Sequence, residues 1–321
     1  MFTGFDARDF DAYAPQKWRS NVFTRERLEV KQKLSALGKQ LATGLAGADG
    51  SPLAVEATAE YPALSNHKQV EAQHVYLFRN EGARRELDAI IDRARPLAQL
   101  IDDPAHEKNH LLLALTIAND ALAIALKLHP EADVDRRNLE RKCEDFFERE
   151  KLLGLLTALP EEFRIGLLPP HAASAGPAAE AATPTRTLDA EALATTLGRF
   201  GGGSNDCLHV GRVFARDDAR LLSPEFEAEA RISLHALLPL YHFVAWTRDN
   251  DFVSMREVLK QEKQARKHKH LARNDRVRIV RGMFAGKAGV VQELDAKGST
   301  LKILVGKMPV KVDAEDVVKV E

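Results

Sequence analysis

Residues 274–295 read NDRVRIVRGMFAGKAGVVQELD, and this stretch decides the fold at the C-terminal end of the chain. Apolar and charged residues alternate on both sides of a cluster of three glycines: Gly282, Gly286 and Gly289. A period of two is typical of strands with one buried face, and glycine accommodates the backbone of a tight turn. The stretch therefore predicts two short strands joined by a turn. Further strands are expected at Leu301–Val305 and Val310–Val312.

This segment resembles a KOW module, the small β-barrel of transcription elongation factors and ribosomal proteins. The resemblance implies a five-stranded, SH3-like barrel over residues 274–321. It also implies that the partner is RNA, or a ribonucleoprotein or transcription complex. In KOW modules a glycine of the turn permits a close approach of the backbone, and here that glycine would be Gly286 or Gly289.

Side chains that project from the turn and its neighbouring loops are the candidates for contact with the partner: Arg278, Arg281, Met283, Phe284 and Lys287. An exposed aromatic ring can stack on a base while adjacent cations neutralise phosphate. Two alternatives remain open. The glycines can serve the turn alone, and Phe284 can fill the end of the barrel instead of stacking on a base.

A helical pattern over residues 251–273 leads into this segment and becomes strongly basic towards its end, where Lys267, Lys269 and Arg273 lie. Cations in this position can contact phosphate and make binding depend on salt. The alternative is a solvated linker helix, which is the usual role of a run of charge.

The composition is that of an ordinary globular protein, with 321 residues, 45% of them hydrophobic and 29% charged. This length suits two or three domains. The net charge of −1 means that attraction to phosphate must come from local patches. Two distant cysteines, Cys143 and Cys207, predict neither a disulfide framework nor a zinc knuckle. Without a signal-peptide pattern or a long apolar run, we expect a cytoplasmic protein that does not enter a membrane.

The first 250 residues alternate between helical and strand patterns. Helices are expected at 24–45, 82–100, 134–159, 188–197 and 223–246, and strands at 53–61, 71–78, 163–168 and 208–214. At 110–129, leucine and isoleucine occupy alternate positions on both sides of Asn119-Asp120, which predicts a β-hairpin. The many alanines of this stretch favour a single buried helix as the alternative.

The order of these pieces is similar to that of the YktB-like proteins, an uncharacterised bacterial family. The similarity lies in the opening FDARDFDAY at 5–13, the double apolar run, LDAEAL at 188–193, and SPEF at 223–226 ahead of LLPLY at 237–241. It implies an α+β fold in which helices pack on an antiparallel sheet. It implies no catalytic residue.

An H-E-x-x-H pattern occurs at His106, Glu107 and His110, and zinc hydrolases use this spacing on a helix. Pro104 precedes the pattern closely and a predicted strand follows it at once, so a helix of the needed length has no room. No third ligand is evident. The sequence also lacks a dinucleotide-binding loop, a phosphate-binding lysine loop and a nucleophile elbow, so neither a metal nor a cofactor is predicted.

Together these patterns predict an α+β domain over residues 1–250, a basic helical connector over 251–273 and a KOW-like barrel over 274–321. The expected function is that of a non-catalytic cytoplasmic factor that docks on RNA or on a transcription or translation complex. Two alternatives are a module that binds only protein, such as a polymerase or ribosomal protein, and a metal-dependent hydrolase that uses the H-E-x-x-H residues.

Overall fold

The computed structural model describes residues 2–63, 66–94, 106–169, 182–201, 206–252, 273–279, 284, 286–294, 300–306, 308–313 and 317–319. The chain divides into two units, Met1–Val253 and Ser254–Glu321, and each is described by itself. The expected basic helix falls almost wholly outside the described residues, as do Lys267 and Lys269.

The first unit is built on a seven-stranded sheet in which every neighbouring pair of strands is antiparallel. In spatial order the strands are β1 (Ala54–Ala57), β2 (Ala72–Phe78), β3 (Leu111–Ala118), β4 (Ala121–Leu128), β7 (Cys207–Ala215), β5 (Arg164–Leu168) and β6 (Thr183–Pro184). The expected α+β class with an antiparallel sheet is therefore confirmed for this unit.

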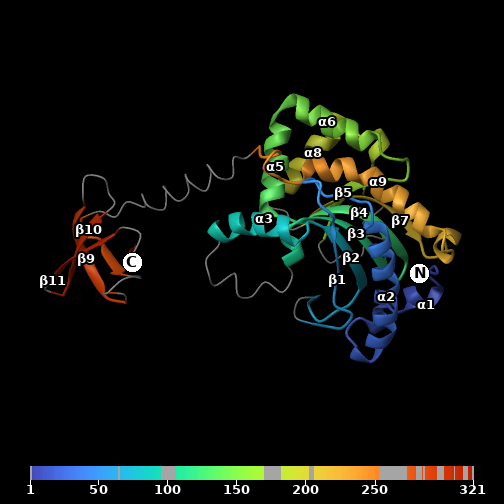
Figure 1. Ribbon diagram of the computed structural model, residues 1–321, viewed down its shortest axis with the longest axis horizontal. Coiled ribbons are helices and arrows are strands. Elements are labelled where there is room, and N and C mark those ends of the chain that lie inside the picture. Colours follow the sequence, from blue (N-terminus) through green and yellow to red (C-terminus); the bar gives the residue numbers. More distant parts are fainter. Residues whose placement is uncertain are drawn as a thin grey trace. The chain divides into compact units, whose positions relative to one another are not determined.

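Helices accompany the sheet, with α2 and α9 running across its strands (Figure 1). The α-helices are α1 (Ala7–Asp11), α2 (Thr24–Ala42), α3 (Glu81–Ala94), α5 (Asp133–Glu144), α6 (Phe146–Thr157), α8 (Ala190–Gly201) and α9 (Phe226–Val244). Short 3₁₀ helices are η1 (Pro15–Lys17), η2 (Asn21–Phe23), η4 (His106–Asn109), η5 (Thr185–Thr187) and η6 (Ala219–Leu222).

The hairpin of β3 and β4 forms the centre of the sheet and confirms the interpretation of the alternating leucines. Its turn is Asn119-Asp120, and the register pairs Ile117 with Leu122 and Leu113 with Leu126. These side chains share one face of the sheet and belong to the hydrophobic core. The alanines that favoured a helix lie at the intervening positions, on the opposite face. The single-helix alternative is therefore wrong.

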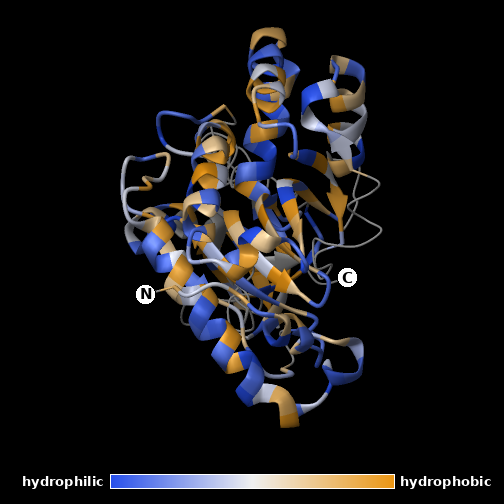
Figure 2. Cartoon of the chain, turned by 90° about the vertical axis from the view of Figure 1, so that its right-hand side faces the viewer, coloured by the Kyte–Doolittle hydropathy of each residue, from blue (hydrophilic) through white to orange (hydrophobic). Residues whose placement is uncertain are grey.

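The core lies between the sheet and the helices α2 and α9. Buried leucines recur along both helices at helical spacing: Leu34, Leu37 and Leu41 in α2, and Leu234, Leu237 and Leu240 in α9. Both hydrophilic and hydrophobic residues occur along the helices in Figure 2. This is the pattern of helices that bury one side and expose the other.

One expected helix, over residues 134–159, is two helices. Asp145 between α5 and α6 has extended backbone angles, φ −79° and ψ 131°. Its carboxylate accepts hydrogen bonds from the backbone N–H groups of Phe147 (2.9 Å) and Glu148 (3.0 Å). Aspartate competes in this way for the first N–H groups of a helix, so it starts a new helix more readily than it continues one.

A buried ion pair joins four distant parts of the first unit. Arg79, just after β2, donates to both carboxylate oxygens of Asp135 in α5, at 2.7 and 2.5 Å. The same carboxylate accepts from the backbone N–H of Leu111 (2.9 Å) and of Trp246 (2.7 Å). Arg79 also donates to the carbonyl oxygen of Trp246 at 2.9 Å. These hydrogen bonds satisfy both buried charges, the guanidinium of Arg79 and the carboxylate of Asp135. They also fix the start of β3 and the end of α9.

The second unit contains a five-stranded antiparallel sheet in the order β11 (Met308–Asp313), β10 (Thr300–Val305), β9 (Ala288–Leu294), β8 (Arg276–Ile279) and β12 (Val317–Lys319). Its buried side chains form a separate small core of Val277, Ile279, Val291, Leu301, Ile303 and Val317. The expected alternating strands are therefore confirmed, and the described tail is all β.

Candidate nucleic-acid interface

The connection from β8 to β9 ends in a tight turn. The backbone N–H of Gly286 donates to the carbonyl of Ile279 (2.7 Å), and the N–H of Ile279 donates to that of Lys287 (2.9 Å). Gly286 has a φ of +84°, a conformation that only glycine adopts readily. Lys287, next to it, is exposed. The turn thus presents a cation at the end of the sheet.

Gly289 has a different role, because it lies against the neighbouring strand. A Cβ atom placed on it would come within 2.5 Å of Cγ2 of Ile303 and 2.6 Å of the carbonyl oxygen of Leu304. No side chain fits there without movement of the β10 backbone. Of the two glycines proposed for close backbone approach, Gly289 makes that approach inside the sheet and Gly286 makes the turn.

Phe284 is half-buried and packs against the small core of the second unit. This is the geometry of the alternative in which the ring covers the end of the core. Arg281, Gly282 and Met283 lie outside the described residues.

Exposed arginines line one face of β8. Arg276 and Arg278 alternate with the buried Val277 and Ile279, so both project from the outer face of the sheet. Arg273, just before the strand, is also exposed. Only Arg278 and Arg273 were singled out from the sequence. The same alternation places Arg276 on the face of Arg278, so the sequence pattern alone is enough to identify Arg276 as a further candidate.

The outer face continues from the arginines into an apolar row. Arg276 pairs with Val290, Val290 with Leu304, and Leu304 with Pro309. Lys302 and Lys311 pair with each other further along the same face, and both are exposed. Lys302 also forms an exposed ion pair with Glu293 at 3.4 Å. The face therefore combines cations with an apolar surface.

Charge is distributed unequally between the units. Residues 254–321 contain 16 Lys and Arg against 9 Asp and Glu, whereas residues 1–253 contain 30 against 38. The overall charge of −1 thus conceals a basic C-terminal unit and an acidic first unit. The net charge of each unit therefore favours long-range attraction of a polyanion such as RNA to the C-terminal unit over the first unit.

Of the H-E-x-x-H residues, His106 and Glu107 lie on η4, a 3₁₀ helix of four residues, and His110 follows it directly before β3. His110 is buried and its ring packs on Phe78, with 5.6 Å between the ring centroids. In the described ranges, no group of three or more His, Cys, Asp or Glu side chains is arranged to hold a metal ion. A 3₁₀ turn also lacks the α-helical repeat that would stack the two histidines one turn apart.

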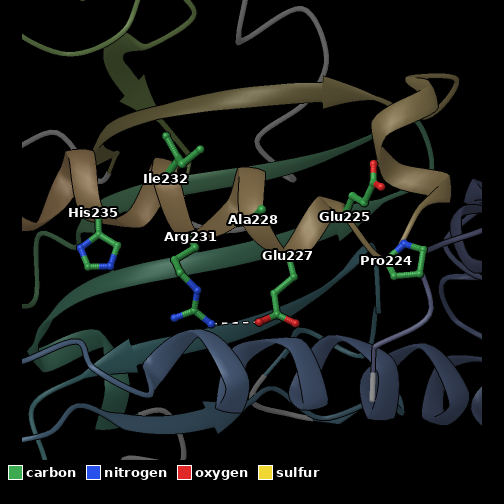
Figure 3. Close-up of a pocket in the computed structure, with 7 residues that line it drawn as sticks. All are labelled: Pro224, Glu225, Glu227, Ala228, Arg231, Ile232 and His235. Carbon is green, nitrogen blue, oxygen red and sulfur yellow. Dashed lines mark hydrogen bonds and ion pairs between the residues drawn. The ribbon is translucent and has the colours of Figure 1, made fainter.

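A hollow of about 620 Å³ runs along the first turns of α9 (Figure 3). Arg231 in this hollow is already engaged, since it pairs with Glu227 (2.9 Å) and donates to the backbone carbonyls of Gln40 and Thr43 in and after α2. Ile232 contributes an exposed apolar side chain. The Arg231 guanidinium in this hollow therefore serves to hold α9 to α2, and its hydrogen bonds are already used within the protein.

No protein-family model matches the chain, and no curated protein matches it either. Across the described ranges, no helix combines the length and the apolar character needed to cross a bilayer.

Proposed function

We propose that the protein is a non-catalytic cytoplasmic factor that docks on RNA, or on a ribonucleoprotein or transcription complex, through its C-terminal unit. The observation that carries this proposal is the pair Arg276 and Arg278 on one exposed face, beside the apolar row of Val290 and Leu304. Cations that neutralise phosphate next to a surface that accepts bases suit single-stranded RNA.

The proposal includes closure of the five strands into an SH3-like barrel of the KOW type. In the order of this sheet β11 and β12 are the two edge strands, and β12, the last strand of the chain, pairs with β8, the first. Closure would bring the two edge strands together, as a barrel requires. Small barrels of this kind bind through their faces and loops. The first unit then supplies a second contact, and two weak contacts in one chain can give tight binding.

The test is binding to a short single-stranded RNA, measured over a series of salt concentrations. Replacing Arg276, Arg278 and Lys287 together by Gln should weaken binding and reduce the slope of log K against log salt by about 2, since each phosphate contact with a single strand contributes about 0.7. The matched control removes three exposed arginines from the first unit, Arg25, Arg85 and Arg141. An unchanged slope in the first variant, or an equal loss in the control, would refute the proposal.

A second candidate is a module that binds only protein. Met308 is 55% exposed at the start of β11, and Pro309 after it is exposed at the end of the apolar row. Such a surface can contact a polymerase or a ribosomal protein. Purification of the tagged protein from its own cells with nuclease treatment distinguishes the two: a protein module keeps its partner after RNA is removed, and an RNA-docking factor loses it.

The third candidate, a metal-dependent hydrolase, is tested by metal analysis of the purified protein. Stoichiometric zinc that is lost on His110→Ala would establish it and overturn the non-catalytic proposal.

A further inference from the structure

The seven-stranded sheet has a second face, formed by the side chains that alternate with those of the core. Val75, Leu115, Ile124 and Val210 point towards the helices and join the core. Their neighbours in β2, β3, β4 and β7 point the other way. These four strands lie side by side in the sheet (Figure 1). The second face therefore gathers residues that are far apart in the sequence.

Polar side chains concentrate on this face. His74 lies opposite Thr116 in the register of β2 and β3, and Lys127 lies opposite His209 in that of β4 and β7. Nδ1 of His74 is 2.9 Å from Oγ1 of Thr116, and Nζ of Lys127 donates to the same hydroxyl at 3.5 Å. The ring of His74 also stacks on that of Tyr76, with centroids 5.6 Å apart and planes at 14°. We call these five residues the sheet-face cluster.

Two members of the sheet-face cluster are short of partners. The side chain of His209 is 5% exposed, and its Nε2 has no hydrogen-bond partner in the described structure. Lys127 is partly exposed, and the long bond to Thr116 is its one hydrogen bond within the described ranges. None of the ion pairs of the described residues includes Lys127. A buried polar group without a partner costs free energy, and an unpaired cation costs more.

Leu112 of β3 and His209 of β7 lie opposite Lys127, and Ala125 precedes it by two positions on the same face. Burial lowers the pKa of the Lys127 ammonium to about 8, and the nearby Cys207 opposes this effect. Burial, followed by the charge of Lys127, lowers the pKa of His209 to about 3, so its ring is neutral. Both effects would be relieved by an anion between the two side chains.

If this face of the sheet only packed against the rest of the protein, it would need neither the ammonium of Lys127 nor the imidazole of His209. Apolar residues of similar volume are often as stabilising as buried charges, or more so. We propose that the sheet-face cluster is a binding site for a small organic anion that carries a carboxylate or phosphate group. The ammonium of Lys127 meets the charge, Nε2–H of His209 donates a hydrogen bond, and the stacked rings of His74 and Tyr76 provide a planar wall.

The test is isothermal titration calorimetry of the full-length protein with benzoate and, separately, with inorganic phosphate, which distinguishes the two anion sources. We expect one of them to bind at one site per chain. Lys127→Met should weaken that binding at least tenfold, and His209→Phe several-fold. Lys39→Met is the control for the same substitution at an exposed position. Binding of neither anion, or equal binding by Lys127→Met, would overturn the proposal.

Two further measurements separate this site from the C-terminal cations and from a folding defect. The variant that lacks Arg276, Arg278 and Lys287 should bind the anion as the wild type does, and loss of binding there would move the site to the second unit. At about pH 8.5, wild-type binding should take up more than about half a proton, because the anion restores the ammonium form of Lys127. Heats that do not depend on the ionisation enthalpy of the buffer would contradict this role.

Discussion

Asp135 is the residue whose loss should most damage the first unit. Its carboxylate accepts four hydrogen bonds, two from Arg79 and one each from the backbone N–H of Leu111 and of Trp246. Asp135→Ala removes all four acceptors at once. Arg79 has a side chain 7% exposed, and it would keep its charge with its carbonyl partner alone.

The magnitude follows from these contacts. Breaking a buried ion pair by removing one partner costs about 3–5 kcal/mol. Each buried N–H left without an acceptor adds about 1–3 kcal/mol. These terms overlap, so we expect a loss of about 5 kcal/mol or more in the free energy of unfolding. The free energy of unfolding of a typical domain is about 5–15 kcal/mol, so the variant should be partly unfolded at 37 °C.

Urea denaturation followed by tryptophan fluorescence measures this loss. Both tryptophans, Trp18 and Trp246, belong to the first unit, so the signal reports on that unit. Glu144→Ala is the control, because Glu144 forms its ion pair with Arg141 on the exposed side of α5 and should change stability by less than about 1 kcal/mol. A loss below about 2 kcal/mol for Asp135→Ala would show that the network does not hold these elements together.

Three further predictions concern single residues. Gly289→Ala should unfold the C-terminal sheet, because the added Cβ would lie 2.5 Å from Cγ2 of Ile303. Thermal melting of the purified full-length variant and of the wild type, followed by circular dichroism, tests this. An unchanged melting curve would contradict the close approach. Asp145→Ala should destabilise the first unit by about 1 kcal/mol in urea through loss of the cap of α6, and no change would mean that the helix break does not depend on the cap. His209 is neutral when folded, with a pKa of about 3 against 6.5 for the free side chain, so the unfolded chain binds the extra proton. Stability should therefore fall below about pH 6.5 by up to about 1.4 kcal/mol per unit, and His209→Phe should remove that slope in urea titrations at several pH values.

The alternation of apolar residues was enough to predict the central hairpin and the C-terminal strands, because a period of two reflects which side chains face the core whatever the strands pair with. It was not enough for the helix break at Asp145, where local capping outweighs a pattern that continues on both sides. On the C-terminal sheet, alternation also implies that Arg276 and Arg278 share one face. The apolar row beside them depends on the register of four strands, β8 to β11.

The sequence by itself determined the α+β class of the first unit and the alternating strands and basic character of the C-terminal unit, since periodicity and charge are local properties of the chain. Only the tertiary structure brought Arg79 to Asp135, 56 positions away, and Lys127 to His209. These contacts depend on strand order and register, which follow from how the whole sheet packs on its helices and not from any single stretch of sequence.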